Sequence, residues 1–204
     1  MEIPEVVILR LPMYVRALKQ INKTDFKLVS SQELGKLLSI TPAQIRKDLS
    51  YFGRFGKQGR GYNVNYLLDE LKQVLKLDKQ WNACIIGIGT LGRAIIRYPG
   101  FGPAGFDIVA AFDSNINLVG QPIRKGLIIQ PITELCSTIK TNNVSIGIVA
   151  VPAENAQAVI DSLASCGVKA ILNYAPISPF THNGIVIRNI DPTLALQSMT
   201  YYLD

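Results

Sequence analysis

The stretch IIGIGTLGRAI, residues 85–95, carries three glycines, Gly87, Gly89 and Gly92, in the spacing G-x-G-x-x-G. An apolar run precedes the first glycine, and a pattern typical of a helix follows the last. In such a strand, turn and helix the backbone can come close to a pyrophosphate, which then lies at the helix N-terminus. The stretch therefore predicts the start of a dinucleotide-binding Rossmann domain, although glycines with this spacing could also serve tight packing alone.

An acidic residue follows at the distance that such a site requires. Asp113 ends the next apolar run, FDIVAAFD, 21 residues after Gly92. There a carboxylate can accept hydrogen bonds from both hydroxyls of the adenosine ribose, and it repels a 2′-phosphate. We therefore expect NADH and NAD as ligands rather than their phosphorylated forms. The alternative is that Asp113 is only a turn residue.

The rest of the second half alternates apolar runs with helical periods. Strands are expected at 82–87, 106–113, 144–151, 169–174 and 184–190, and helices are expected to begin near Leu91, Thr133, Ala153 and Asp191. Continuously apolar strands separated by helices are typical of a parallel sheet covered on both faces, so we predict an α/β fold. The candidate cofactor-binding residues lie in the glycine turn and at the strand ends: Gly87, Ile88, Gly89, Thr90, Leu91, Gly92, Asp113, Ser114, Val151, Pro152, Asn173, Tyr174 and Ala175.

Groups that would do chemistry on a bound dinucleotide are missing from the sequence pattern. His182 is the only histidine, and its surroundings, ISPFTHNG, predict a loop. No tyrosine has a lysine four residues later, and neither H-E-x-x-H nor G-x-S-x-G occurs. We therefore expect neither catalytic residues nor a metal site, and we predict that the chain binds a dinucleotide without being an enzyme.

The basic charge is confined to the first part of the chain. Residues 1–80 hold 14 Lys and Arg against 8 Asp and Glu, whereas residues 81–204 hold 7 of each. Such an imbalance is typical of a module that binds a polyanion, although a solvated basic face gives the same count.

Two capped helices are expected within this basic part. Apolar residues recur at helical spacing over 11–21, a helix that Pro12 can begin. Ser30 and Glu33 have the spacing of a capping box, and Thr41 and Gln44 repeat it, with Pro42 at the first helical position. Because only a short turn separates the second and third helices, the pattern predicts a helix-turn-helix.

The third helix and the segment after it supply the candidate DNA contacts. Ile45, Leu49 and Phe52 recur at i, i+4 and i+7 and should face the core. The glycine-rich segment GRFGKQGRGYNV, residues 53–64, predicts a basic wing that can enter a minor groove, and an amphipathic helix follows it over 67–77. The candidate DNA-binding residues are Gln44, Arg46, Lys47, Ser50, Tyr51, Arg54, Lys57, Arg60 and Tyr62.

The cysteines and the N-terminus indicate a cytoplasmic protein. Cys84, Cys136 and Cys166 are widely spaced, odd in number and set in apolar segments, so we expect buried free thiols in a reducing compartment. The first residues lack the order of a signal peptide, and no apolar run is long enough to span a membrane.

Several segments in order resemble the Rex family of redox-sensing transcriptional repressors: RLPMYVRALKQ, TPAQIRKDLSYFGRFGKQGRGYNV, IIGIGTLGRAI, FDSN, AVPA, ILNYAP and NIDPTLALQ. The resemblance extends from about Ile8 to Tyr202. It implies a winged helix that binds double-stranded operator DNA, an inverted repeat, as a homodimer, and a Rossmann domain that binds NADH and thereby releases the DNA. It also implies that the last helix is exchanged between subunits and that Arg16, Tyr98 and Asp191 form a polar switch. Pro192 departs from the aliphatic residue expected there, but proline is sound at a first helical position.

The expected organisation is therefore a winged-helix DNA-binding domain at 1–80, a Rossmann NAD(H)-binding domain at 81–190 and an exchanged dimer helix at 191–204. The expected function is a repressor that senses the ratio of NADH to NAD+. Two alternatives stay open: an NAD-dependent dehydrogenase with an appended winged helix, and a regulator that senses another adenosine cofactor such as coenzyme A.

Overall fold

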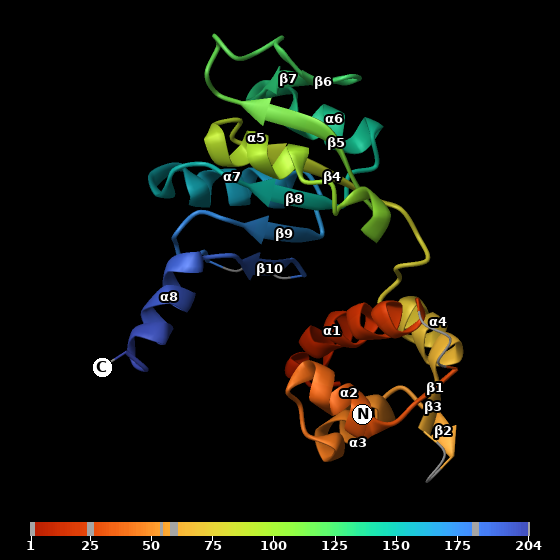
Figure 1. Cartoon of the computed structure of the whole chain (residues 1–204). Helices are drawn as coiled ribbons and strands as arrows, with labels where there is room; N and C mark the ends of the chain where they lie inside the picture. The colour runs from red at the N-terminus through yellow and green to blue at the C-terminus, as the bar shows by residue number, and fades with distance from the viewer. Residues whose placement is uncertain (1–2, 24–26, 54, 58–60, 181–183, 204) are drawn as a thin grey trace. The chain divides into compact units, whose positions relative to one another are not determined.

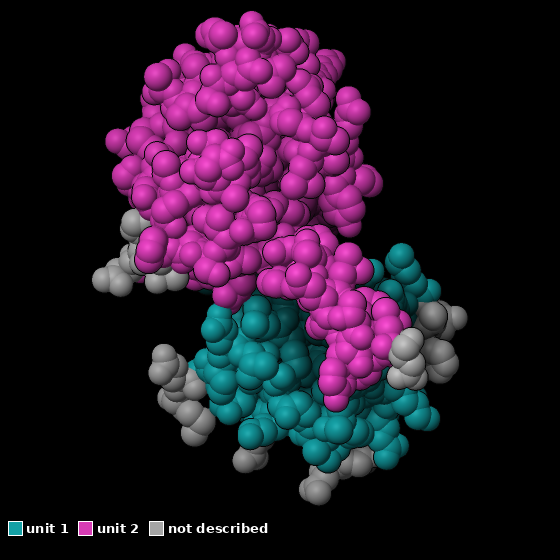
Figure 2. Space-filling model, turned by 90° about the vertical axis from the view of Figure 1, so that its left-hand side faces the viewer, with its two compact units in different colours: residues 1–79 teal, residues 80–204 magenta. Residues whose placement is uncertain are grey.

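The computed structural model describes residues 3–23, 27–53, 55–57, 61–180 and 184–203. The chain forms two compact units, which meet in the sequence at Lys79 and Gln80, one residue before the expected boundary (Figure 2). Each has its own hydrophobic core.

The first unit combines four helices with a small sheet (Figure 1). The helices are α1 (Glu5–Ile21), α2 (Ser31–Leu38), α3 (Pro42–Ser50) and α4 (Val64–Val74). The strands β1 (Leu28–Val29), β2 (Gly56–Lys57) and β3 (Gly61–Asn63) pair antiparallel in the order β1-β3-β2. Ile45 and Leu49 are buried and Phe52 packs against the same core, so the predicted inner face of α3 is confirmed. Helices α2 and α3 with the strands that follow make a winged helix-turn-helix.

The helix ends confirm part of the capping prediction. Glu33 donates its backbone N–H to Ser30 Oγ at 3.1 Å, and Ser30 returns a backbone N–H to Glu33 Oε2 at 2.7 Å. At α3, Thr41 Oγ1 accepts from the backbone N–H of Gln44 at 3.2 Å, but the Gln44 side chain bonds to Asp48 instead of closing the box. The prediction that Pro12 begins a helix is wrong, because α1 begins at Glu5 and carries Pro12 inside it. Pro12 and Ile8 are exposed, so water can satisfy the Ile8 carbonyl that proline leaves without a donor.

The second unit is a seven-stranded sheet with helices on its faces (Figure 1). Its strands are β4 (Trp81–Ile86), β5 (Phe106–Asp113), β6 (Pro122–Arg124), β7 (Leu127–Pro131), β8 (Ile146–Val149), β9 (Ala170–Asn173) and β10 (Val186–Asn189). The order is β10-β9-β8-β4-β5-β7-β6, and all pairs are parallel except β6 with β7. The α/β fold is thus confirmed, whereas the hairpin of β6 and β7 was not predicted.

The helices of this unit are α5 (Thr90–Arg97), α6 (Leu135–Thr141), α7 (Ala153–Ser165) and α8 (Pro192–Thr200), with short 3-10 turns η1 (Gly102–Ala104) and η2 (Ile132–Glu134). Strand β4 shows how both sheet faces are buried. Cys84 and Ile86 belong to a core that includes residues of α6 and α7, whereas Ala83 and Ile85 belong to a core that includes residues of α5. Alternate residues of a strand point to opposite faces, so a continuous apolar run is what this central strand requires.

The expectation of three free cysteines is wrong. Cys136 in α6 and Cys166 at the C-terminal cap of α7 form a disulfide with a Cα–Cα distance of 4.8 Å, and only Cys84 is free among the described residues. The two cysteines are 30 residues apart in the sequence, and only the topology of the folded chain brings their helices together. The sequence pattern therefore did not reveal the pair. Burial raises the pKa of the Cys84 thiol to about 12. In the described part of the chain, no helix combines the length and the apolar character that crossing a membrane requires.

Candidate functional site

The three glycines after β4 each fulfil a different geometric requirement. Gly87 has a φ of +94°, and a Cβ there would lie 2.4 Å from the carbonyl oxygen of Ala150. A Cβ at Gly92 would lie 1.9 Å from the carbonyl oxygen of Gly87, so this glycine permits α5 to pack on the turn. A Cβ at Gly89 would meet nothing within 4 Å. The space beside Gly89 is therefore open to a ligand, as the pyrophosphate of a dinucleotide requires.

The N-terminus of α5 faces this opening with backbone alone. Gly89 is the N-cap and supplies no side-chain hydrogen bond, while Thr90 and Leu91 in the first turn are exposed. The first N–H groups of a helix lack intrahelical partners and favour an anion.

Asp113 is tied to the glycine turn. Its Oδ2 accepts the backbone N–H of Ile88 at 2.7 Å, and its Oδ1 accepts the backbone N–H of Asn115 at 2.8 Å. A carboxylate offers about four lone-pair positions, so acceptor capacity remains for two ribose hydroxyls. The buried Ile88 acts here through its backbone, and Ser114 next to the carboxylate is exposed.

The remaining predicted cofactor residues lie at the carboxyl ends of β8 and β9. Strand β8 lies beside β4 and β9 lies beside β8, and all three run parallel, so their carboxyl ends lie at the same edge of the sheet as the glycine turn. Val151 is half-buried and Pro152 is exposed, whereas Ala175 is buried. Tyr174 is half-buried, and desolvation raises the pKa of its phenol.

Asn173 at the end of β9 is fully buried. Its Nδ2 donates to the carbonyl oxygen of Ala175 at 2.9 Å and to Asn189 Oδ1 at 2.9 Å, and its Oδ1 accepts from the backbone N–H of Ala175 at 3.0 Å. These bonds hold the loop after β9 in shape. Direct contact of Asn173 with a cofactor stays a prediction.

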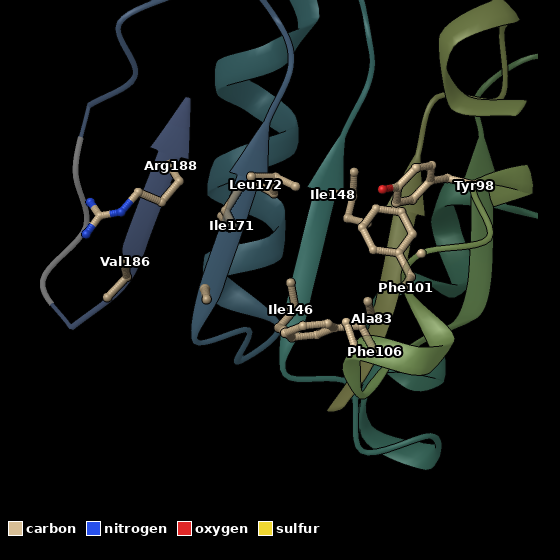
Figure 3. A pocket seen from close by; sticks show the side chains of 13 residues that line it. Ala83, Tyr98, Phe101, Phe106, Ile146, Ile148, Ile171, Leu172, Val186 and Arg188 are labelled. Carbon is tan, nitrogen blue, oxygen red and sulfur yellow. The ribbon is translucent and has the colours of Figure 1, made fainter. Parts of the chain in front are cut away.

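An apolar pocket of about 470 Å³ lies on the α5 side of the same sheet (Figure 3). Tyr98 and Phe101 form one side of it, and Val186 on β10 marks the other. Between them lie apolar side chains of β4, β8 and β9, including Ile148 and Leu172. None of the glycines of the predicted dinucleotide site lines it, so this is a separate feature of the unit.

The candidate DNA-binding residues that the structure describes lie on α3, directly after it, and in β2 and β3. Arg46, Lys47 and Ser50 are exposed, and Gln44 and Tyr51 are half-buried. Arg46 Nη1 donates to Ser31 Oγ at 3.0 Å, and Ser50 Oγ donates to the Lys47 carbonyl at 2.7 Å.

On the wing, Tyr62 in β3 is half-buried, and desolvation raises the pKa of its phenol. Lys57 belongs to β2. Arg54, Arg60 and the loop residue His182 lie outside the described residues.

Asp48 is a residue that the sequence patterns missed. It is fully buried on α3, where Oδ2 accepts Arg10 Nε at 2.6 Å and the Tyr14 hydroxyl at 2.6 Å. Its Oδ1 accepts Arg10 Nη2 at 2.7 Å and Gln44 Nε2 at 2.6 Å. Burial disfavours the charge, but the hydrogen bonds from Arg10, Tyr14 and Gln44 outweigh it, so the pKa of Asp48 lies below its ordinary value. The sequence did contain a signal for this cluster. Asp48 directly precedes Leu49 on the inner face of α3, and Arg10 and Tyr14 lie one turn apart on α1.

The three predicted switch residues are divided between the two units. Arg16 is exposed on α1 in the first unit. In the second, Tyr98 is 59% exposed with its ring 5.1 Å from that of Phe101, and Asp191 caps α8 by accepting the Thr193 N–H at 2.9 Å. Their coupling stays a prediction.

Comparisons with known proteins bear on both units. Residues 2–50 match a family described as "Putative DNA-binding protein N-terminus", and residues 78–177 match one described as "CoA binding domain". The redox-sensing transcriptional repressor Rex of Roseiflexus sp. is 48% identical over 99% of this chain and 91% of its own. This chain belongs to the Rex family. Rex of Syntrophobacter fumaroxidans is 40% identical over 99% of this chain and 96% of its own.

Solved structures of the Rex family extend the match to three dimensions. The crystal structure of RSP in complex with β-NAD+ and operator DNA has a TM-score of 0.93 at 38% identity, and the match covers 100% of this chain and 93% of that one. RSP in complex with β-NADH has a TM-score of 0.89 at 37% identity, over 100% of this chain and 95% of that one. The Rex relatives are named as repressors, which supports a regulator rather than an enzyme.

Proposed function

We propose that this chain is a DNA-binding transcriptional repressor that senses the ratio of NADH to NAD+. The observation that carries this proposal is the full-length match to RSP, which was solved with β-NAD+ and operator DNA and also with β-NADH. The geometry supports it independently, because Gly89 leaves room for a pyrophosphate and Asp113 keeps acceptor capacity for a ribose. In the same chain, α3 presents Arg46 and Lys47 to solvent, as a DNA-reading helix does.

NADH should release DNA far better than NAD+. The two forms share adenosine and pyrophosphate, so the nicotinamide end must discriminate between them. Val151, at a strand end expected there, offers apolar surface, and Glu154, the first acid after it along the chain, is exposed. Burying the cationic oxidised ring against such surface costs free energy that the neutral reduced ring does not incur. NADH shifts DNA binding only as far as it prefers the released arrangement.

The working unit of this repressor is a homodimer that reads an inverted repeat. No residue of α8 is buried, and even its apolar residues Leu194 and Met199 are 62% and 59% exposed. Helix α1 likewise exposes Val6, Leu9 and Met13 along one side. Exposed apolar side chains of this kind mark protein contacts, and they support exchange of α8 between two subunits.

The open sheet face also supports a dimer. In β9, Ile171 and Asn173 are buried towards α7, while Ala170 and Leu172 on the pocket side stay partly exposed. Val186 on the edge strand β10 is 52% exposed. A second copy of the chain would cover this face.

A repressor of chromosomal DNA would work in the cytoplasm.

One experiment tests the sensing function. The purified chain is titrated onto an operator selected from random double-stranded DNA, at fixed total dinucleotide and varied ratio of NADH to NAD+. We expect the bound fraction to fall as the ratio rises. Dependence on total dinucleotide alone would leave a nucleotide-binding repressor without redox sensing.

A second set of measurements tests the two alternatives, a regulator that senses coenzyme A and a dehydrogenase. The match of residues 78–177 to a domain described as CoA-binding makes coenzyme A the specific competitor. A thermal-shift panel of NADH, NAD+, NADPH and coenzyme A should show the largest stabilisation with NADH. Oxidation of bound NADH by carbonyl substrates would instead indicate a dehydrogenase.

A further inference from the structure

The buried carboxylate of Asp48 constrains a side chain on the outer part of the same helix. Gln44 lies one turn before Asp48 on α3, and its Nε2 donates to Asp48 Oδ1 at 2.6 Å. A carboxylate in this setting only accepts hydrogen bonds, so the amide of Gln44 must turn its nitrogen inward.

The carboxylate itself cannot turn away from Gln44. Arg10 binds both of its oxygens, at 2.6 and 2.7 Å, and the Tyr14 hydroxyl adds a third bond at 2.6 Å. Both donors lie on α1, so the orientation of the carboxylate is fixed from outside the helix that carries it. With the bond from Gln44, four donors occupy about four lone-pair positions.

The amide oxygen of Gln44 is left available on the outside. Among the described residues, every buried side-chain oxygen has a hydrogen-bond partner. The Gln44 Oε1 has no hydrogen-bond partner, because the Gln44 bonds are made by its backbone N–H and by Nε2. This oxygen is therefore not buried and is accessible. Gln44 stands in the first turn of α3, at i−3 from the exposed Lys47. The N-terminal residues of such a helix are the ones that contact base edges in a major groove.

We propose that Gln44 reads a base in each half-site with its Oε1 as a fixed acceptor, and that Asp48 is the positioning residue that sets this direction. An acceptor in the major groove selects an exocyclic amino group, which adenine and cytosine present there. Guanine O6 and thymine O4 are themselves acceptors and are disfavoured at that position. The inference rests on the proposed function, since it specifies which bases the repressor selects.

The test is selection from a random double-stranded DNA library with the full-length chain and three variants. Gln44→Met keeps the length of the side chain and removes its polar atoms. We expect it to lose roughly tenfold of its discrimination at one base pair of each half-site, with the other positions unchanged. Gln73→Met on α4 is the matched control, because it makes the same change at an exposed glutamine of the same unit, and it should select the same sequences as the unmodified chain.

Asp48→Asn tests the positioning. Arg10 donates to both oxygens of the native carboxylate, so the single oxygen of an asparagine cannot serve Arg10 and Gln44 as before, and the amide of Gln44 is no longer held in one orientation. The preference for adenine or cytosine at that base pair should therefore weaken, because either end of the Gln44 amide can then face the DNA. Should this variant not fold, NMR of the unmodified chain reads the same property, because a carboxylate-bound Gln44 amide gives one strongly shifted and slowly exchanging proton.

The outcomes separate the two claims. Unchanged selection by Gln44→Met overturns base reading by Gln44. A folded Asp48→Asn variant with unchanged preference, or a Gln44 amide with two solvent-like protons, overturns the positioning role. If the unmodified chain enriches no sequence, the proposed function fails and the inference fails with it.

Discussion

Asp113 Oδ2 accepts the backbone N–H of Ile88 at 2.7 Å, so the last residue of β5 is bonded directly to the glycine turn after β4. The carboxylate that would select the ribose therefore also helps to hold the turn that would bind the pyrophosphate. Loss of the side chain and loss of its charge should consequently have different effects.

Asp113→Asn should lower NADH affinity roughly tenfold, equivalent to about 1.4 kcal/mol, and should narrow the preference over NADPH. The asparagine oxygen can still accept from Ile88, while the charge that repels a 2′-phosphate is gone. Calorimetry with both cofactors measures the effect. Asp107→Asn at the other end of β5 is the control, because its exposed pair with Arg124 at 3.0 Å contributes little. Equal affinity of the unmodified chain for NADH and NADPH would refute this role of Asp113.

Alanine at two glycines of the same turn should separate binding from folding. Gly92→Ala sets a Cβ 1.9 Å from the Gly87 carbonyl oxygen, and it should cost about 1–3 kcal/mol of unfolding free energy. Gly89→Ala meets no atom within 4 Å, so it should leave stability nearly unchanged but obstruct the pyrophosphate. Thermal unfolding and dinucleotide titration of both variants check this. Unimpaired NADH binding by Gly89→Ala would show that the ligand lies elsewhere.

The geometry of the candidate dinucleotide site was predictable because its determinants are local. The turn carries three glycines at fixed positions, and Asp113 follows at the end of the next strand, so all four residues are visible along one stretch of chain. The capping box at Ser30 and Glu33 was predictable for the same reason.

What the patterns missed depends on contacts between distant segments. Asp48 meets Arg10 and Tyr14 across more than 30 residues, and Cys136 meets Cys166 across a separation of 30. Periodicity can place a residue such as Asp48 on an inner face, but it does not show which distant residue meets it. The strands β6 and β7 are short, and the preceding turn residues obscured their alternation.

DNA binding should depend on the charges that α3 exposes. Lys47→Ala or Arg46→Ala should weaken operator binding, and a lysine that only contacts phosphate should lower the slope of log affinity against log salt by about one. Lys140→Ala, on the exposed surface of α6 in the other unit, is the control. Gel-shift titrations at several salt concentrations measure both quantities. If neither α3 variant changes the affinity, this face of α3 does not bind the DNA.

The Asp48 cluster should make the stability of the first unit depend on pH. The pKa of Asp48 is lowered on folding from an ordinary value of 3.8, so its contribution is present above that value and is lost as the pH falls through the folded pKa. Arg10→Met leaves the buried charge unpaired and should cost roughly 3 kcal/mol at pH 7, near the lower end of the usual range because the Arg10 side chain is 20% exposed.

This cost should shrink at acid pH, because protonation of Asp48 removes the unpaired charge. Denaturant unfolding of the unmodified chain and of Arg10→Met between about pH 3 and pH 7 provides the comparison. Tyr14→Phe removes a neutral donor and should cost less, about 1–2 kcal/mol. A difference between the unmodified chain and Arg10→Met that stays constant over this range would mean that Asp48 is not the charged partner.

Dimerisation should depend on the exposed apolar residues of α8. Leu194 and Met199 are 62% and 59% exposed in the single chain, and a helix that buries none of its residues gains its stability from a partner. Replacing both by serine should shift the monomer–dimer equilibrium towards monomer by at least tenfold, because about 1.5–3 kcal/mol is lost for each large apolar side chain that is no longer buried. Sedimentation at the protein concentration that binds operator measures this shift.

Ile116→Ser is the control, since Ile116 is 78% exposed in the loop after β5 and lies far along the chain from α8. Operator affinity should fall together with dimerisation, because one α3 reads a single half-site and two are needed to contact successive major grooves. A doubly substituted chain that remains dimeric would exclude α8 from the interface, and one that is monomeric but binds operator with full affinity would exclude the dimer as the DNA-reading unit.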